Sequence, residues 1–250
     1  MTRRRLRNPR PWSEFPSESS ARRSCGIWRE GQSVTVMPDT VEIDLGPLRL
    51  KGLLGVPGNA EGLVIFAHGS GSGRLSPRNN RVAAKLRSAG LATLLIDLLT
   101  TEEEQDRANI FDISLLASRL SFATDWSIAQ SETRHLPTGY FGASTGAGAA
   151  LVAAAVPRSP VAAIVSRGGR PDLAGDALVR VLAPTLLIVG GLDAQVLELN
   201  RMAYQRLVAP KELVIVEGAG HLFEEPGTLD EVERHAQRWF RYHLAGSSGA

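Results

Sequence analysis

The chain has 250 residues, a formal net charge of +2 and a single cysteine, Cys25. This length suits one domain, or one domain with an appendage, and can bury a core without help from disulfides or metals. One cysteine excludes an intramolecular disulfide, which fits a cytoplasmic protein. No apolar run reaches the roughly 18 residues that a membrane-spanning helix needs, so we expect no membrane segment.

The positive charge is concentrated at the start of the chain. Residues 1–36 hold eight arginines against three glutamates, a net charge of +5. The segment is rich in Arg, Ser and Pro, which is typical of disorder, and it lacks the apolar core of a secretory signal. A nucleic-acid- or partner-binding arm, an organelle-targeting segment and an inert extension are all compatible with it. We favour the inert extension, and we predict a disordered segment over residues 1–36, a folded domain over residues 37–250 and no nucleic-acid partner.

From residue 41 onward, strand and helix patterns alternate. Two apolar runs around Gly46-Pro47 predict an opening hairpin at residues 41–46 and 48–57. Buried strands are then predicted at residues 63–67, 91–97, 138–141, 161–166, 185–190 and 212–218. The acidic segment 101–109 predicts a loop or a frayed helix. Helices are predicted after Ser76-Pro77, after Asp112, and at residues 147–156, 196–208 and 229–244.

Continuous apolar strands that alternate with helices indicate an α/β fold, with a parallel sheet covered on both faces. In such sheets, functional groups lie at the carboxyl ends of the strands. The candidate residues should therefore follow strands.

The stretch Gly142-Ala143-Ser144-Thr145-Gly146 fits the pattern G-x-S-x-G. A chain of this composition contains about 0.2 such matches by chance, so the setting matters more than the motif. Here the motif follows a predicted strand and opens a predicted helix, which is the setting of a nucleophile elbow. The alternative is a plain glycine turn. We interpret Ser144 as a candidate nucleophile.

A nucleophilic serine needs a base and a group that orients the base. Among the five histidines, His221 lies in the loop after the last predicted strand, where it can reach the site. Asp193 follows another strand by a short glycine step in "LLIVGGLD", and an aspartate there can hold the imidazole tautomer. The alternatives are a loop histidine and a helix N-cap. We predict His221 as the base and Asp193 as its acid.

Two backbone N–H groups are candidates for an oxyanion hole. One belongs to Thr145, next to Ser144, and the other belongs to Ser70 in the loop "HGSGSG". This glycine run could also cradle a phosphate, but it matches neither common nucleotide motif. The sequence has no H-E-x-x-H and no Cys/His cluster, so we expect neither a metal nor a cofactor.

Ser144, Asp193 and His221 in this order, with His68-Gly69 upstream, resemble the α/β-hydrolase superfamily over about residues 41–244. The compact length and the stretches "HGSGSG", "GLD" and "GAGHLF" are most similar to its dienelactone-hydrolase-like branch. The resemblance implies an eight-stranded, mostly parallel sheet with helices on both faces, no large cap domain, and ester hydrolysis. The name-giving enzymes use a cysteine nucleophile, so lactone specificity does not carry over to a chain with Ser144.

We therefore expect a serine carboxylesterase that acts on small or short-chain esters, as a monomer or homodimer. A perhydrolase or haloperoxidase-like enzyme on the same triad and a non-catalytic small-molecule-binding protein are the alternatives. Arg167, at the end of a predicted strand, is a candidate for binding a substrate carboxylate, with a salt bridge to Asp172 as the alternative. His68 is a second candidate substrate contact.

Overall fold

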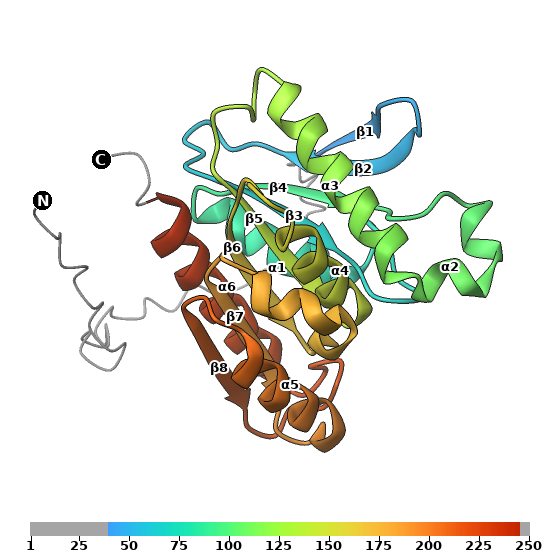
Figure 1. Cartoon of the computed structure of the whole chain (residues 1–250). Coiled ribbons are helices and arrows are strands. Elements are labelled where there is room, and N and C mark those ends of the chain that lie inside the picture. Colours follow the sequence, from blue (N-terminus) through green and yellow to red (C-terminus); the bar gives the residue numbers. More distant parts are fainter. Residues whose placement is uncertain (1–39, 246–250) are drawn as a thin grey trace, which may run out of the picture. The chain divides into compact units, whose positions relative to one another are not determined.

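A mostly parallel sheet organises residues 40–245, the part of the chain that the computed structural model describes (Figure 1). Its eight strands follow the order β1-β2-β4-β3-β5-β6-β7-β8. They are β1 (Val41–Leu45), β2 (Leu50–Gly55), β3 (Leu63–Ala67), β4 (Ala92–Ile96), β5 (Thr138–Ala143), β6 (Val161–Arg167), β7 (Thr185–Gly190) and β8 (Lys211–Val216). The predicted extension over residues 1–36 lies outside the described residues.

The sheet changes direction only at one end. β1 pairs antiparallel with β2, and β2 pairs antiparallel with β4, whereas all other neighbouring strands are parallel. Strands β3, β4, β5 and β7 are buried along their whole length, as expected for a sheet covered on both faces. The predicted hairpin and the eight-stranded, mostly parallel sheet are confirmed.

Helices cover both faces of the sheet (Figure 1). The helices are α1 (Pro77–Ser88), α2 (Arg107–Phe111), α3 (Ile113–Ala129), α4 (Thr145–Ala154), α5 (Ala194–Arg206) and α6 (Thr228–Leu244), with 3₁₀ segments η2 (Glu103–Gln105) and η3 (Pro171–Arg180). Helices α1 and α6 pack together on one face, while α3, α4 and α5 lie on the other with η3. Within residues 40–245 no large cap domain is inserted between the strands.

Local sequence signals explain where the helices begin. The Ser76 side chain accepts a hydrogen bond from the Asn79 N–H, and Pro77 occupies the first helical position of α1. The Asp112 carboxylate caps α3 in the same way, at 2.9 Å from the Leu115 nitrogen. The acidic segment 101–109, predicted as a loop or a frayed helix, holds η2 and the first residues of α2. The sequence patterns missed η3, because Gly175 interrupts it with a positive φ and leaves no sustained helical period.

Candidate active site

Ser144 occupies a sharp turn between β5 and α4. Its φ is +50° and its ψ is −122°, a conformation that a residue with a side chain rarely adopts. The flanking glycines make this turn possible, because a Cβ at Gly142 would lie 2.5 Å from the Ala147 Cα and one at Gly146 would lie 2.2 Å from the Ala67 carbonyl oxygen. The predicted helix 147–156 therefore begins earlier, at Thr145, directly after the serine. The strand–turn–helix setting that the motif predicted is confirmed.

His221 and Asp193 meet at the carboxyl ends of the neighbouring strands β8 and β7. The Nδ1 of His221 lies 2.6 Å from the Asp193 Oδ2. With Nδ1–H donating to the carboxylate, Nε2 is left as the basic nitrogen. Asp193 stands at the N-cap position of α5 but makes no side-chain capping bond, so its carboxylate serves the histidine and not the helix.

His221 packs over the end of β6, the strand next to β5. A Cβ at Gly168 would lie 3.0 Å from the His221 carbonyl oxygen and 3.7 Å from the ring carbon Cε1. Gly168, with φ at +51°, thus lets the loop that carries His221 lie close to the strand end. The three predicted triad residues follow β5, β7 and β8, and His221 lies against Gly168 at the end of β6, the strand between β5 and β7.

The glycine-rich loop after β3 lies against the elbow. A Cβ at Gly69 would lie 2.8 Å from the Ser144 Cβ. The Ser70 N–H donates to the Thr145 hydroxyl oxygen at 3.1 Å, so the predicted donor of Ser70 is directed at the elbow and has an acceptor in the free protein. The Thr145 N–H stands at the start of α4, where the helix dipole favours negative charge.

A cavity of about 730 Å³ opens beside this loop. Residues 68–78 form one wall, and Thr145 lies at its end. The rest of the lining is partly apolar and includes Leu99, Ile110 and Leu116. A volume of this size accommodates a small organic ligand. A second hollow of about 720 Å³ along α6 shares none of these residues and is lined mainly by charged side chains.

His68 is buried at the edge of the cavity, and its ring bonds to backbone atoms on both sides. Its Nε2 accepts the Leu98 N–H at 2.9 Å, and its Nδ1 lies 3.0 Å from the Gly69 carbonyl oxygen. The ring is therefore neutral, with the proton on Nδ1 donated to that carbonyl. Both nitrogens are engaged, which favours a structural role for His68 over the predicted substrate contact.

Arg167 ends β6 and is only 8% exposed. Its Nε and Nη1 have no hydrogen-bond partner among the described residues, and burial together with the charge of Arg78 lowers its pKa to about 10. The alternative salt bridge to Asp172 is wrong, because Arg170 binds that carboxylate through two bonds of 2.8 and 2.7 Å. A buried guanidinium without a counterion is costly and marks a place where an anion would be stabilised.

The sequence patterns missed Arg78, which also lines the cavity. It lies just inside α1 and binds Glu224, in the loop that carries His221, at 2.7 Å. Its position directly after the Ser76-Pro77 helix start was a signal that it would border the loop. Within residues 40–245 no group of three potential metal ligands occurs, and no helix there is long and apolar enough to cross a membrane.

A parallel sheet of this strand order, with a strained serine between its central strand and the next helix, is the architecture of the α/β hydrolases. Within that class, the chain belongs to the dienelactone hydrolase family. It is 57% identical to a dienelactone hydrolase from Anabaena variabilis, and the two structures superpose with a TM-score of 0.78 over 82% of this chain and 97% of that one. The chain is thus a member of a hydrolase family.

Other similar proteins extend this picture. Est1E from Butyrivibrio proteoclasticus is 16% identical and superposes with a TM-score of 0.69 over 82% of this chain and 98% of its own, which shows a shared fold. Two Mycobacterium tuberculosis proteins with the provisional name phosphoribosyl transferase are 60% identical over 208 residues, or 83% of this chain and 47% of theirs. The chain therefore spans about half the length of these relatives. No protein-family model matches it.

Proposed function

We propose that this protein is a serine carboxylesterase that hydrolyses small or short-chain esters. The 2.6 Å hydrogen bond between His221 and Asp193 carries the proposal, because it prepares a basic nitrogen at the same edge of the sheet as the strained Ser144. The name of the mycobacterial relatives belongs to longer proteins, of which this chain matches 47%.

The reaction proceeds by two acyl transfers. Ser144 Oγ attacks the ester carbonyl carbon while His221 Nε2 takes the hydroxyl proton, and Asp193 stabilises the resulting imidazolium. The carbonyl oxygen becomes an oxyanion that accepts hydrogen bonds from the N–H groups of Thr145 and Ser70. The Ser70 N–H gives up its bond to the Thr145 hydroxyl to make this one. His221 then passes its proton to the leaving alkoxide, and a water molecule releases the acyl group by the same steps.

A panel of p-nitrophenyl esters from acetyl to decanoyl tests this function. We expect turnover that is highest for the short chains, and covalent labelling by a fluorophosphonate at Ser144. Absence of both in the folded protein would favour the binding-protein alternative. Peroxide-dependent halogenation in excess of ester hydrolysis would favour the perhydrolase alternative.

Arg167 supports a finer proposal, a preference for esters that carry a free carboxylate. Its unpaired guanidinium is buried at the strand end next to the elbow, and a carboxylate would satisfy it with charge-assisted hydrogen bonds. Arg167→Ala should lower kcat/KM for a half-ester of a dicarboxylic acid by about 10- to 150-fold, the equivalent of roughly 1.5–3 kcal/mol for a lost charged hydrogen bond. Its kcat/KM for a neutral ester of equal size should hardly change.

Arg170→Ala is the matched control, since Arg170 lies three residues away and already has Asp172 as its partner. It should leave the ratio of acidic to neutral ester turnover unchanged. Equal preferences in wild type and the Arg167 variant would assign Arg167 a structural role.

A further inference from the structure

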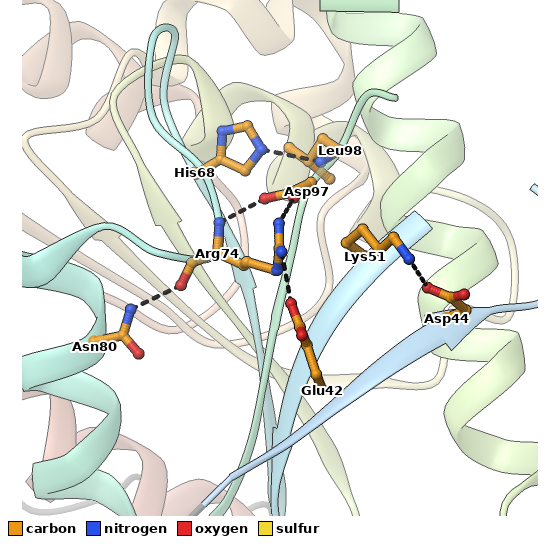
Figure 2. A network of polar contacts seen from close by, with 8 residues as sticks. All are labelled: Glu42, Asp44, Lys51, His68, Arg74, Asn80, Asp97 and Leu98. Atoms are coloured by element: carbon orange, nitrogen blue, oxygen red, sulfur yellow. Dashed lines mark hydrogen bonds and ion pairs between the residues drawn. The ribbon is translucent and has the colours of Figure 1, made fainter. Parts of the chain in front are cut away.

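The loop that carries Ser70 is fastened at both ends by two consecutive residues that follow β4. At the start of the loop, the ring of His68 accepts the Leu98 N–H. At its end, Asp97 accepts the backbone N–H of Arg74 at 2.6 Å through Oδ1 and the Arg74 guanidinium at 2.5 Å through Oδ2 (Figure 2). One short segment at the strand end therefore holds residues 68 and 74.

Arg74 is engaged through its backbone as well as its side chain. Its carbonyl oxygen accepts a bond of 2.7 Å from the Asn80 side chain, which ties the end of the loop to α1 (Figure 2). Its guanidinium also reaches Glu42 on β1 at 2.7 Å. The Arg74 and Asp97 side chains are only 19% and 18% exposed, whereas Glu42 is 61% exposed. The bond to Asp97 is thus the shielded one, and the bond to Glu42 should contribute little.

The carboxylate can reach the loop only because Gly73 has no side chain. A Cβ at that position would lie 2.7 Å from the Asp97 Oδ1. Of the residues between the two anchors, 69, 71 and 73 are glycines, and Gly71 has a φ of +67°. Such a stretch loses much conformational entropy on ordering, so it needs external contacts to stay in one conformation.

An oxyanion hole works because its donors are already in position when the charge develops. Within the described part of the chain, the one hydrogen bond of Ser70 runs from its N–H to the Thr145 hydroxyl, and the reaction must exchange it for a bond to the oxyanion. During that exchange the position of the Ser70 N–H depends on the anchors of the loop.

We propose that Asp97 and Arg74 are positioning residues that hold the Ser70 N–H in place for the oxyanion. The inference rests on the proposed esterase function. Both residues line the cavity, but the effect proposed for them passes through the backbone of residues 69–73 and not through a contact with the substrate.

Asp97→Ala tests the proposal with three readouts on the full chain. We expect kcat for p-nitrophenyl acetate to fall by about 10- to 100-fold with KM within about twofold, because loosening one donor forfeits part of the 10²–10³ that such a donor supplies. The affinity for an alkyl boronic acid, which forms a tetrahedral adduct with the serine, should fall by the same factor. Amide hydrogen exchange in a peptide covering residues 69–75 should become faster.

Asp97→Asn refines the test, since its side-chain oxygen can still accept the Arg74 N–H but its charge is lost. Its kcat and boronate affinity should lie between those of the wild type and those of Asp97→Ala.

Asp44→Ala is the matched control, because Asp44 binds Lys51 at 2.5 Å on the hairpin without touching the loop (Figure 2). It should leave kcat, boronate affinity and loop exchange unchanged. If Asp97→Ala does not fold, Arg74→Met removes the ion pair but keeps the backbone N–H bond to Asp97, so its kcat and boronate affinity should fall in the same direction by a smaller factor.

The proposal is overturned if a folded Asp97→Ala or Arg74→Met variant keeps the wild-type kcat and loop exchange. It is also overturned if kcat falls while boronate affinity stays the same, because the loss would then not come from the oxyanion hole. Failure of the esterase function is distinct, since wild type itself would then neither hydrolyse the ester nor bind the boronate. Amide hydrogen exchange in residues 69–75 would still show whether Asp97 holds the loop in place.

Discussion

The backbone of Ser144 shows how a single residue is prepared for chemistry. A non-glycine residue in so sparsely populated a conformation costs roughly 1–3 kcal/mol, and it persists only where the surroundings enforce it. Here the close contacts at Gly142 and Gly146 enforce it, because strand β5 and helix α4 approach so closely at the turn. The strain holds the side chain at the carboxyl edge of the sheet, beside Gly69.

Ser144→Ala should lower kcat for short esters by about 10⁶, as removal of the nucleophile does in other serine hydrolases. Alanine keeps the same strained backbone, so the melting temperature should change little. Kinetics with p-nitrophenyl acetate and a thermal melt provide the check. A folded variant with near-normal turnover would rule out Ser144 as the nucleophile.

Asp193→Asn isolates the role of the acid. The amide cannot accept the Nδ1–H of His221 through its nitrogen and favours the wrong imidazole tautomer, so kcat should fall by about 10⁴ with the fold intact. The pH profile of kcat/KM should also change, since the imidazolium loses its counter-charge. Retained activity would mean that another carboxylate orients His221.

Helix α6 carries a histidine, His243, whose protonation we expect to change the free energy of unfolding. Burial lowers the pKa of His243 to about 4, and the centroid of its ring lies 4.5 Å from that of the Trp239 ring. The unfolded chain binds the proton near pH 6.5 and the folded one only near pH 4, so folding stability should fall as the pH drops through this window. Because the ring is only partly buried, we expect a loss of roughly 1–2 kcal/mol, less than full linkage implies.

His243→Phe should remove this part of the acid sensitivity. Urea unfolding of wild type and variant at pH 7 and pH 4.5 gives the free energy of unfolding of each. The difference in this free energy between the two proteins should change by roughly 1–2 kcal/mol between the two pH values. His235, also on α6, has a pKa lowered by burial and contributes in the same direction in both proteins, so it cancels from the comparison. An unchanged difference would show that His243 is not protonated selectively in the unfolded state.

For the whole molecule, the basic segment at the start of the chain is the clearest test of domain organisation. Residues 1–36 have a net charge of +5 and little apolar periodicity. Deleting them should shift the melting temperature by no more than a degree or two and leave kcat unchanged. A large fall in either quantity would indicate that the segment packs on the hydrolase domain.

Much of the fold was predictable because strands, helices and helix caps depend on residues that are close together in the sequence. The strands at residues 63–67 and 185–190 were predicted with the bounds that the structure shows, since each is a continuous apolar run. Both predicted helix caps, Ser76 and Asp112, are found, because a cap involves only residues within one turn. The short helices between β4 and α3 and the kinked η3 lack a sustained period and were not resolved from sequence.

Ser144, Asp193 and His221 were within reach of sequence reasoning, because residues that follow parallel strands must gather at one edge of the sheet. Arg74, Asp97 and Glu42 were not, because the Arg74–Asp97 contact depends on β3 lying beside β4 and the Arg74–Glu42 contact depends on the β1-β2 hairpin lying at that end of the sheet. No local pattern encodes this strand order. The sequence also did not show that Arg167 is unpaired, because both Arg167 and Arg170 could bind Asp172 and only the packing shows which guanidinium is left buried without a partner. Strands and helices could be predicted because their burial pattern repeats along the chain. Ion pairs could not, because they join residues from different strands and loops, and these come together only when the sheet is assembled.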